Sequence, residues 1–210
     1  MVKVASIILL VLGSVSLMAL PVDQIVGWII LNISALLCMA CYAKRWAQHI
    51  GILVAATALI ALVPVNTDVS SSHILLMGFV LAAVVAGPYA INRYVLKDGA
   101  IKLQFWLGRR INKIELAYMF CVALLAYLIL PPYLYSTDSY LNWSVVLDAN
   151  HITRLFVGTN ALGIWDELFF VGVCLALLSR HIPFWWANVA QSVMWTAFLY
   201  ELGFQEQVAL

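Results

Sequence analysis

The chain has 210 residues, of which 65% are hydrophobic and only 10% are charged, and its mean hydropathy is +0.99. Soluble domains are about half apolar and about a quarter charged, so this composition indicates one integral membrane domain over residues 1–210 and excludes a sizeable soluble domain. The formal net charge of +1 excludes a basic nucleic-acid surface, and the lipid bilayer becomes the expected environment.

Seven apolar runs follow one another along the chain, bounded by charged residues, prolines or short polar clusters. A membrane-crossing helix needs roughly 20 apolar residues, and most of these runs come close to that length. We therefore predict an all-α fold, a multi-pass transmembrane helical bundle of about seven spans. The predicted spans cover residues 4–20, 24–43, 50–65, 73–91, 114–132, 155–179 and 184–203.

The basic residues fall in alternate connections, and this alternation predicts the orientation of the chain. Positively charged flanks stay in the cytoplasm. Ten of the eleven lysines and arginines lie on one side of the predicted spans, and Arg154 alone lies opposite. The amino terminus is therefore expected in the cytoplasm and the carboxyl terminus outside. The ten residues on the cytoplasmic side are Lys3, Lys44, Arg45, Arg93, Lys97, Lys102, Arg109, Arg110, Lys113 and Arg180.

Two adjacent acids, Asp166 and Glu167, occupy the middle of the sixth predicted span. Ionisable groups inside a membrane are costly and are by default candidates for function. At 100° per residue, Asn160 and Glu167 share a polar stripe, so we expect Glu167 to point towards other helices, with Asp166 beside it and Asn160 as a candidate substrate contact. Such acids suit general-base activation of water. The alternative is structural: a protonated Glu167 that hydrogen-bonds across helices.

The segment around these acids resembles a known membrane family. The run WDELFFVG at 165–172, followed by a basic turn and PFWW at 183–186, is similar to the first motif of the CPBP family. That family includes the CAAX-processing endopeptidases and bacterial proteins associated with bacteriocin self-immunity. The resemblance covers about residues 155–204 and implies an integral protein of the bacterial cytoplasmic membrane.

The resemblance also implies an activity, that of a metal-dependent intramembrane endopeptidase acting on a membrane-embedded peptide or protein. In the family, the acidic pair is held to activate the attacking water, and histidines on later spans bind a divalent metal such as zinc. This assigns catalytic roles to Glu167 and Asp166, with Asn188 and Gln191 as candidate polarising groups. The metal ligands are left open, with Glu201 as one candidate.

Departures from the family pattern leave other functions open. The family's arginine position is occupied by Val171, and the segment 192–201 carries no histidine. The alternative function is therefore a noncatalytic membrane protein that binds a peptide or partner through the same polar cleft. A proton-coupled transporter is a third interpretation, although the sequence shows no internal repeat.

Overall fold

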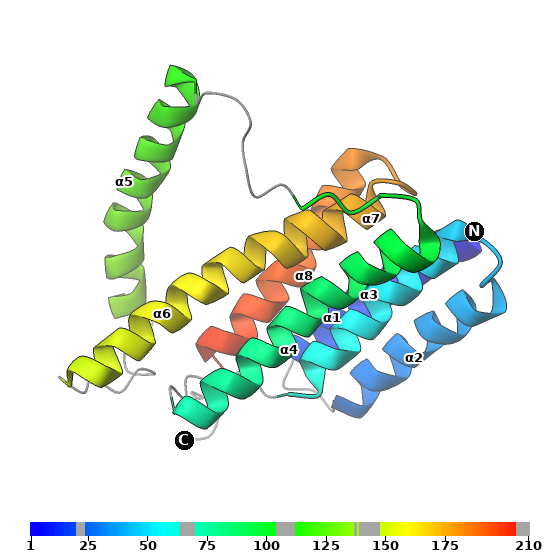
Figure 1. Ribbon diagram of the computed structural model, residues 1–210, viewed down its shortest axis with the longest axis horizontal. Coiled ribbons are helices and arrows are strands. Elements are labelled where there is room, and N and C mark those ends of the chain that lie inside the picture. Colours follow the sequence, from blue (N-terminus) through cyan, green and yellow to red (C-terminus); the bar gives the residue numbers. More distant parts are fainter. Residues whose placement is uncertain (20–23, 64–69, 104–111, 137, 139–147, 205–210) are drawn as a thin grey trace.

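A computed structural model describes residues 1–19, 24–63, 70–103, 112–136, 138 and 148–204, with side chains up to residue 200. All the secondary structure in this part of the chain is helical, so the predicted all-α fold is confirmed. Most of the helices run alongside one another as long rods, and the amino terminus lies at one end of the bundle (Figure 1).

In the first half of the chain, the described residues form four α-helices and a short π-helix that continues the fourth without a break. The fourth helix begins with a polar cap, because the Ser70 side chain accepts a hydrogen bond from the His73 N–H. The π-helix ends at Leu96, and the left-handed φ of 56° at the next residue, Lys97, turns the chain. The bounds are α1 Val2–Met18, α2 Gln24–Ala40, α3 Arg45–Ala61, α4 Ser71–Ala90 and η1 Ile91–Leu96.

The second half contains a separate helix, a long composite rod and a final helix that runs back along the bundle. α6, η3 and α7 follow one another directly and form a single rod of 30 residues. The chain then reverses direction through residues 179–183 and enters α8. The bounds are α5 Lys113–Ser136, α6 Ala149–Asp166, η3 Glu167–Leu175, α7 Ala176–Leu178 and α8 Phe184–Phe204.

α1 and α2 pack closely because a glycine removes a side chain from their contact. A Cβ atom on Gly27 would lie 2.7 Å from Cγ of Leu17 and 3.0 Å from its backbone nitrogen. The Ser34 hydroxyl donates a hydrogen bond to the Ser6 carbonyl across the same contact, at 2.9 Å. Small residues that let two helix backbones approach are typical of helix pairs in membranes.

Aromatic side chains join the composite rod to α8. Trp165 stacks on Phe169 with ring centroids 5.2 Å apart, and Phe170 stacks on Trp195 at 5.6 Å. Phe198 packs against Trp165 at 5.1 Å. Because large buried rings contribute most of the contact area at such an interface, they determine which face of the rod is buried.

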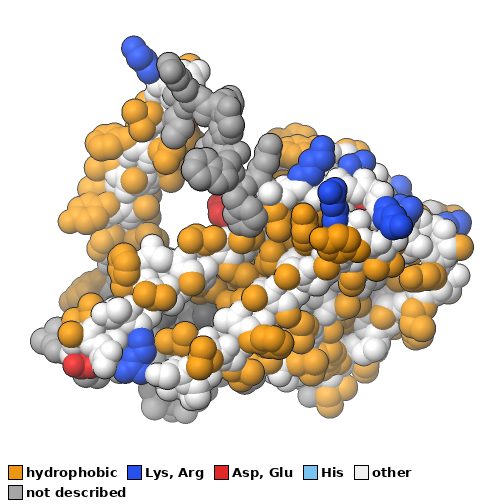
Figure 2. Space-filling view, in the orientation of Figure 1, with side chains coloured by type: hydrophobic (Ala, Val, Ile, Leu, Met, Phe, Trp, Pro, Cys, Tyr) orange, Lys and Arg blue, Asp and Glu red, His pale blue; other side chains and the backbone are white. Residues whose placement is uncertain are grey.

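Large hydrophobic side chains cover much of the outside of the bundle (Figure 2). Within the described residues α5 buries none of its side chains, and it stands apart from the other helices (Figure 1). α1, α2 and α3 are apolar but have 17 residues each. Among the described residues, three helical segments are long and apolar enough to cross a membrane: Ser71–Leu96, Lys113–Ser136 and Ala149–Leu178.

Candidate functional site

The two acids of the sixth predicted span lie where α6 joins η3. Asp166 ends α6 and is 7% exposed, whereas Glu167 begins η3 and is exposed. The prediction that Glu167 points inward is therefore wrong. The cause is local, because the buried rings of Trp165 and Phe169 fix the inner face of the rod. At 100° per residue, that face includes Asp166 and leaves Glu167 outside.

Glu167 belongs to a continuous exposed face of the rod, which we call the acid face. Among the described residues, Glu167 has no hydrogen-bond or ion-pair partner. Arg154 and Arg180 each lie 13 residues from it, which is about 20 Å along an ideal helix. Glu167 is therefore at the middle of the apolar length of the rod. The acid face consists of Asn160, Gly163, Ile164, Glu167 and Val171.

Asp166 lies in an interface with α8 whose hydrogen-bonding groups are incompletely satisfied. Oδ1 of Asp166, Nε1 of Trp195 and Oε1 of Gln191 are buried, and none has a partner of hydrogen-bond geometry in the described part of the chain. The Trp195 indole nevertheless lies near enough to act on the carboxyl group. A buried polar atom without a partner lowers the stability of the folded protein by about 1–3 kcal/mol. One added hydrogen bond would therefore stabilise this interface.

Of the three amides predicted to line one cleft with Glu167, only Asn160 lies on the same face. Asn160 is exposed and donates to the Phe156 carbonyl of its own helix at 2.7 Å. Gln191 is buried and donates to Oδ1 of Asn188 at 3.1 Å. Asn188 lines a different pocket, of about 430 Å³ between α1 and α8, to which neither acid contributes. The residues predicted to form one polar cleft therefore lie in two separate places, Asn160 and Glu167 on the acid face and the bonded pair Asn188 and Gln191 on α8.

The predicted metal has no ligand set among the residues that the structure describes. No group of three or more His, Cys, Asp or Glu side chains in those ranges is placed to hold a metal ion. Glu201 belongs to α8, but its side chain lies outside the described residues. Zinc binding at Glu201 therefore stays a prediction.

The structure assembles a second polar site, which sequence reasoning missed and which we call the His–Asp cluster. Nδ1 of His49 lies 2.8 Å from Nε2 of His181, and Nε2 of His49 lies 2.6 Å from Oδ2 of Asp98. His49 is 2% exposed. The three residues come from the start of α3, the segment after η1 and the connection before α8. The cluster therefore ties together three separate parts of the chain.

Further contacts hold the His–Asp cluster from both sides. The Asn92 side-chain amide donates to Oδ1 of Asp98, and Arg45 Nε lies 3.9 Å from its Oδ2. Lys3 Nζ donates to the His181 carbonyl at 2.7 Å. Lysine and arginine side chains gather at this end of the bundle, near the amino terminus (Figures 1 and 2).

The hydrogen bonds of the cluster have a defined direction. Burial would raise the pKa of Asp98, but hydrogen bonds from the Ala100 N–H, His49 and Asn92 outweigh it and hold the pKa below its usual value. The Asp98 carboxylate therefore accepts from His49 Nε2–H, and a neutral His49 accepts at Nδ1 from His181 Nε2–H. Burial is the largest cause that lowers the pKa of His181 to about 4, and the Lys3 charge adds to it. Such a chain can pass a proton by tautomer exchange.

The sequence does contain a signal for the His–Asp cluster, because its basic residues fall in alternate connections between the predicted spans. Lys3, His49, Asp98 and His181 all belong to helix ends or connections on the predicted cytoplasmic side. The topology alone therefore brings them to one layer of the molecule. It does not tell which of them are neighbours, because lateral placement depends on helix packing.

Comparison with known proteins does not assign a family. No protein-family model matches the chain, and comparison with curated proteins and with solved structures finds no significant match. The resemblance to the CPBP family therefore rests on the sequence motif at 165–172 and 183–186 alone. The geometry of the described residues has to carry any functional proposal.

Proposed function

We propose that this chain is a multi-pass integral membrane protein that binds a membrane-embedded helix of a partner protein through the acid face. The observation that carries the proposal is the exposure of Glu167 at the middle of a rod long and apolar enough to cross a bilayer. A carboxyl group that faces lipid at this depth is costly. A partner helix that supplies a hydrogen-bond donor or a cation removes that cost.

The contacts between helix ends support the membrane orientation in this proposal. Lys3 contacts the connection before α8, and Arg45 lies beside Asp98, so residues predicted to be cytoplasmic lie together. At the opposite end, Arg154 Nη1 donates to the Ser71 hydroxyl at 3.3 Å. We accordingly propose seven spans in a bacterial cytoplasmic membrane, with the amino terminus in the cytoplasm and the carboxyl terminus outside.

The composition of the acid face suits a helix as the bound element. A Cβ atom on Gly163 would meet nothing within 4 Å, so a backbone can approach there. Asn160 and Glu167 lie on either side of this glycine, about one turn away. A small residue flanked by hydrogen-bonding groups is a recurrent arrangement at helix contacts in membranes.

Site-specific photo-crosslinking in native membranes tests the proposal. A photoreactive residue replaces Ile164, which is 63% exposed on the acid face, and a matched control replaces Phe79, which is 75% exposed on α4. We expect a discrete crosslinked polypeptide from position 164 and only diffuse lipid adducts from position 79. The same pattern from both positions would contradict a dedicated face.

Two substitutions of Glu167 show whether the carboxyl group makes the contact. Glu167→Leu should abolish the crosslink from position 164, because leucine offers no hydrogen bond. Glu167→Gln should keep most of it if the partner donates a hydrogen bond, and should lose about tenfold or more if the partner is a cation. An undiminished crosslink in Glu167→Leu would refute the role of the acid.

A second candidate function, intramembrane hydrolysis of the bound peptide, is favoured by the backbone at this position. The π-helix η3 begins at Glu167, and π-helical segments within α-helices occur frequently at functional sites. If Glu167 activates water, Glu167→Gln should lower cleavage of a reconstituted membrane peptide by about 10² or more, with folding intact. Binding without any cleavage by the unaltered chain would leave the noncatalytic function.

A further inference from the structure

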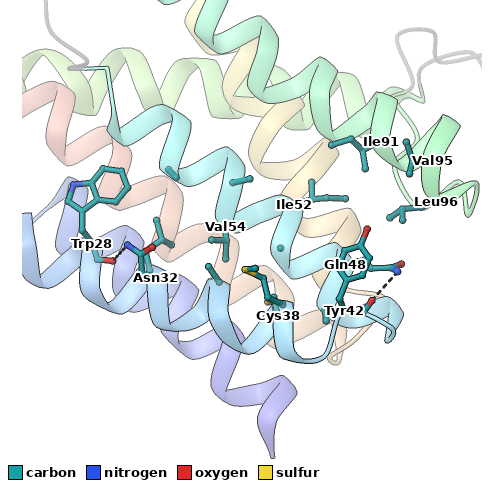
Figure 3. A pocket seen from close by; sticks show the side chains of 17 residues that line it. Trp28, Asn32, Cys38, Tyr42, Gln48, Ile52, Val54, Ile91, Val95 and Leu96 are labelled. Atoms are coloured by element: carbon teal, nitrogen blue, oxygen red, sulfur yellow. Dashed lines mark hydrogen bonds between the residues drawn. The ribbon is translucent and has the colours of Figure 1, made fainter.

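A groove of about 480 Å³ runs between α2 and α3 and reaches η1 (Figure 3). Trp28 on α2 and Tyr42, in the turn just after α2, mark its two ends (Figure 3). They are 14 residues apart in the sequence, which is about 21 Å along a helix. One leaflet of a bilayer is about half of the roughly 30 Å hydrocarbon core, so the groove is long enough for one acyl chain. Its apolar walls include Leu31, Ala35, Cys38, Ile52, Val54 and Ala58.

The Tyr42 end of the groove carries two cations. Arg45 Nη1 donates to Oε1 of Gln48, which lines the groove, and Gln48 Nε2 donates to the Tyr42 carbonyl; both bonds are 3.1 Å. The Arg45 side chain is 50% exposed, although its Nε faces Asp98. Lys44, the neighbouring residue, is exposed. None of the described residues that line the groove is acidic, so its walls are uncharged. Asp98 offsets one of the two cations, so Lys44, Arg45 and Asp98 together leave a net positive charge at this end.

We propose that this groove binds an anionic phospholipid of the cytoplasmic leaflet, with one acyl chain between α2 and α3 and the phosphate group at Lys44 and Arg45. The apolar walls match a hydrocarbon chain, and the cationic end matches a phosphate. Both cations belong to the predicted cytoplasmic side, where anionic headgroups lie. Tyr42 occupies the depth at which aromatic residues contact the headgroup layer.

The lipid site is separate from the acid face. It uses the proposed membrane location but not the partner contact, since the acid face belongs to α6 and η3. If no lipid binds but the crosslink from position 164 forms, the lipid site alone is refuted. If lipid binds but the crosslink does not form, partner binding alone is refuted.

The test uses the full chain, purified in mild detergent and titrated with dioleoyl phosphatidylglycerol or dioleoyl phosphatidylcholine. Native mass spectrometry reports the bound lipid, and the thermal midpoint reports stabilisation by binding. We expect phosphatidylglycerol to bind more tightly, by about fivefold for each cation that contacts it, because a surface lysine or arginine contributes about that factor towards an anionic lipid.

A pair of glycine substitutions tests the acyl-chain position. Gly51 lines the groove, and Cys38 Cβ at 3.8 Å is the one contact that a Cβ atom there would make among the described residues. Gly78 on α4 is the control, since a Cβ atom there meets nothing within 4 Å. Gly51→Leu fills the groove and should weaken phosphatidylglycerol binding by about tenfold or more, while Gly78→Leu should leave it unchanged. Circular dichroism confirms that both variants are folded.

A pair of lysine substitutions tests the phosphate position. Lys44→Gln should weaken phosphatidylglycerol binding by about fivefold and leave phosphatidylcholine binding unchanged. Lys113→Gln removes the same charge from α5, on the same predicted side, and should change the binding of neither lipid.

Equal effects of the two glycine variants on phosphatidylglycerol binding would show a general lipid contact only and overturn the proposal. Equal affinity of the unaltered chain for the two lipids would overturn it as well.

Discussion

Asp98 connects the segments that meet at the end of the bundle that carries Lys3 and Arg45. Its carboxylate accepts hydrogen bonds from Ala100, Asn92 and His49, and Arg45 stands 3.9 Å away. A carboxylate that accepts several hydrogen bonds is strongly favoured in its charged form. His49 in turn orients His181. A proton gained by Asp98 or by His181, the two ends of this row of hydrogen bonds, therefore disturbs contacts between α3, η1 and the connection before α8.

Acid should destabilise the folded protein through His181. Its pKa lies near 4 in the folded state against 6.5 as the ordinary value, so between these pH values the unfolded chain binds a proton that the folded chain does not. Stability should fall as the pH drops from about 6.5 to about 4, by about 1 to 2 kcal/mol after allowance for solvent screening. Thermal midpoints in detergent across this range measure the effect.

The control for this prediction is a histidine at the opposite end of the molecule. His151→Gln on α6 should keep the acid sensitivity of the original chain, whereas His181→Gln should show a flatter profile between pH 4 and 6.5. Identical profiles for these two variants would rule out His181 as the source.

At the level of helices, the contact between α1 and α2 depends on close backbone approach. Gly27 provides the space, and the Ser34 hydroxyl bonds the Ser6 carbonyl beside it. The rod of α6, η3 and α7 is held differently, by stacked aromatic rings against α8. Close packing at small residues thus positions α1 against α2, whereas aromatic contacts position the rod against α8.

Gly27→Leu should separate α1 from α2 and lower the unfolding free energy by about 1–3 kcal/mol, the usual cost of overpacking. A Cβ atom at this position would already lie 2.7 Å from the Leu17 side chain. Gly158→Leu is the matched control, because a Cβ atom there meets nothing within 4 Å. Unfolding in detergent compares the two variants. Equal stability would mean that the α1–α2 contact adjusts freely.

The helices could be predicted well from the sequence, because the length of each run of apolar residues can be counted directly. Each of the seven predicted runs overlaps a helical segment of the described chain. α2 begins at residue 24 as expected, whereas α3 begins at residue 45, five residues before the predicted run. The orientation of the acids was not predictable in the same way. Trp165 and Phe169 decide which face of the rod is buried, and their partner Phe198 belongs to another helix. Facing is therefore a property of helix packing, which one sequence does not specify.

At the level of the whole molecule, the two ends of the bundle differ in charge. Lys3, Arg45, His49, Asp98 and His181 lie at one end. The Arg154–Ser71 contact lies at the other. Because flanking lysines and arginines keep a segment in the cytoplasm, this asymmetry gives the proposed orientation.

Reporter fusions test that orientation. A reporter inserted after Lys102 should be active in the cytoplasm. One fused after Leu210 should be active outside, because the seven proposed spans are an odd number. Alkaline phosphatase and green fluorescent protein report the two locations. Both fusions on one side of the membrane would contradict seven spans.

The hydrogen bond from Lys3 to the His181 carbonyl joins residues 178 positions apart, and α1 also packs against α8. A chain emerging from the ribosome therefore completes α1 long before its neighbour α8 is synthesised. Domains dominated by such distant contacts fold late and expose unpaired surfaces in the meantime. During synthesis, the surface of α1 that packs against α8 therefore has no contact with that helix until residues 184–204 have been made, whereas its contact with the neighbouring α2 can form early.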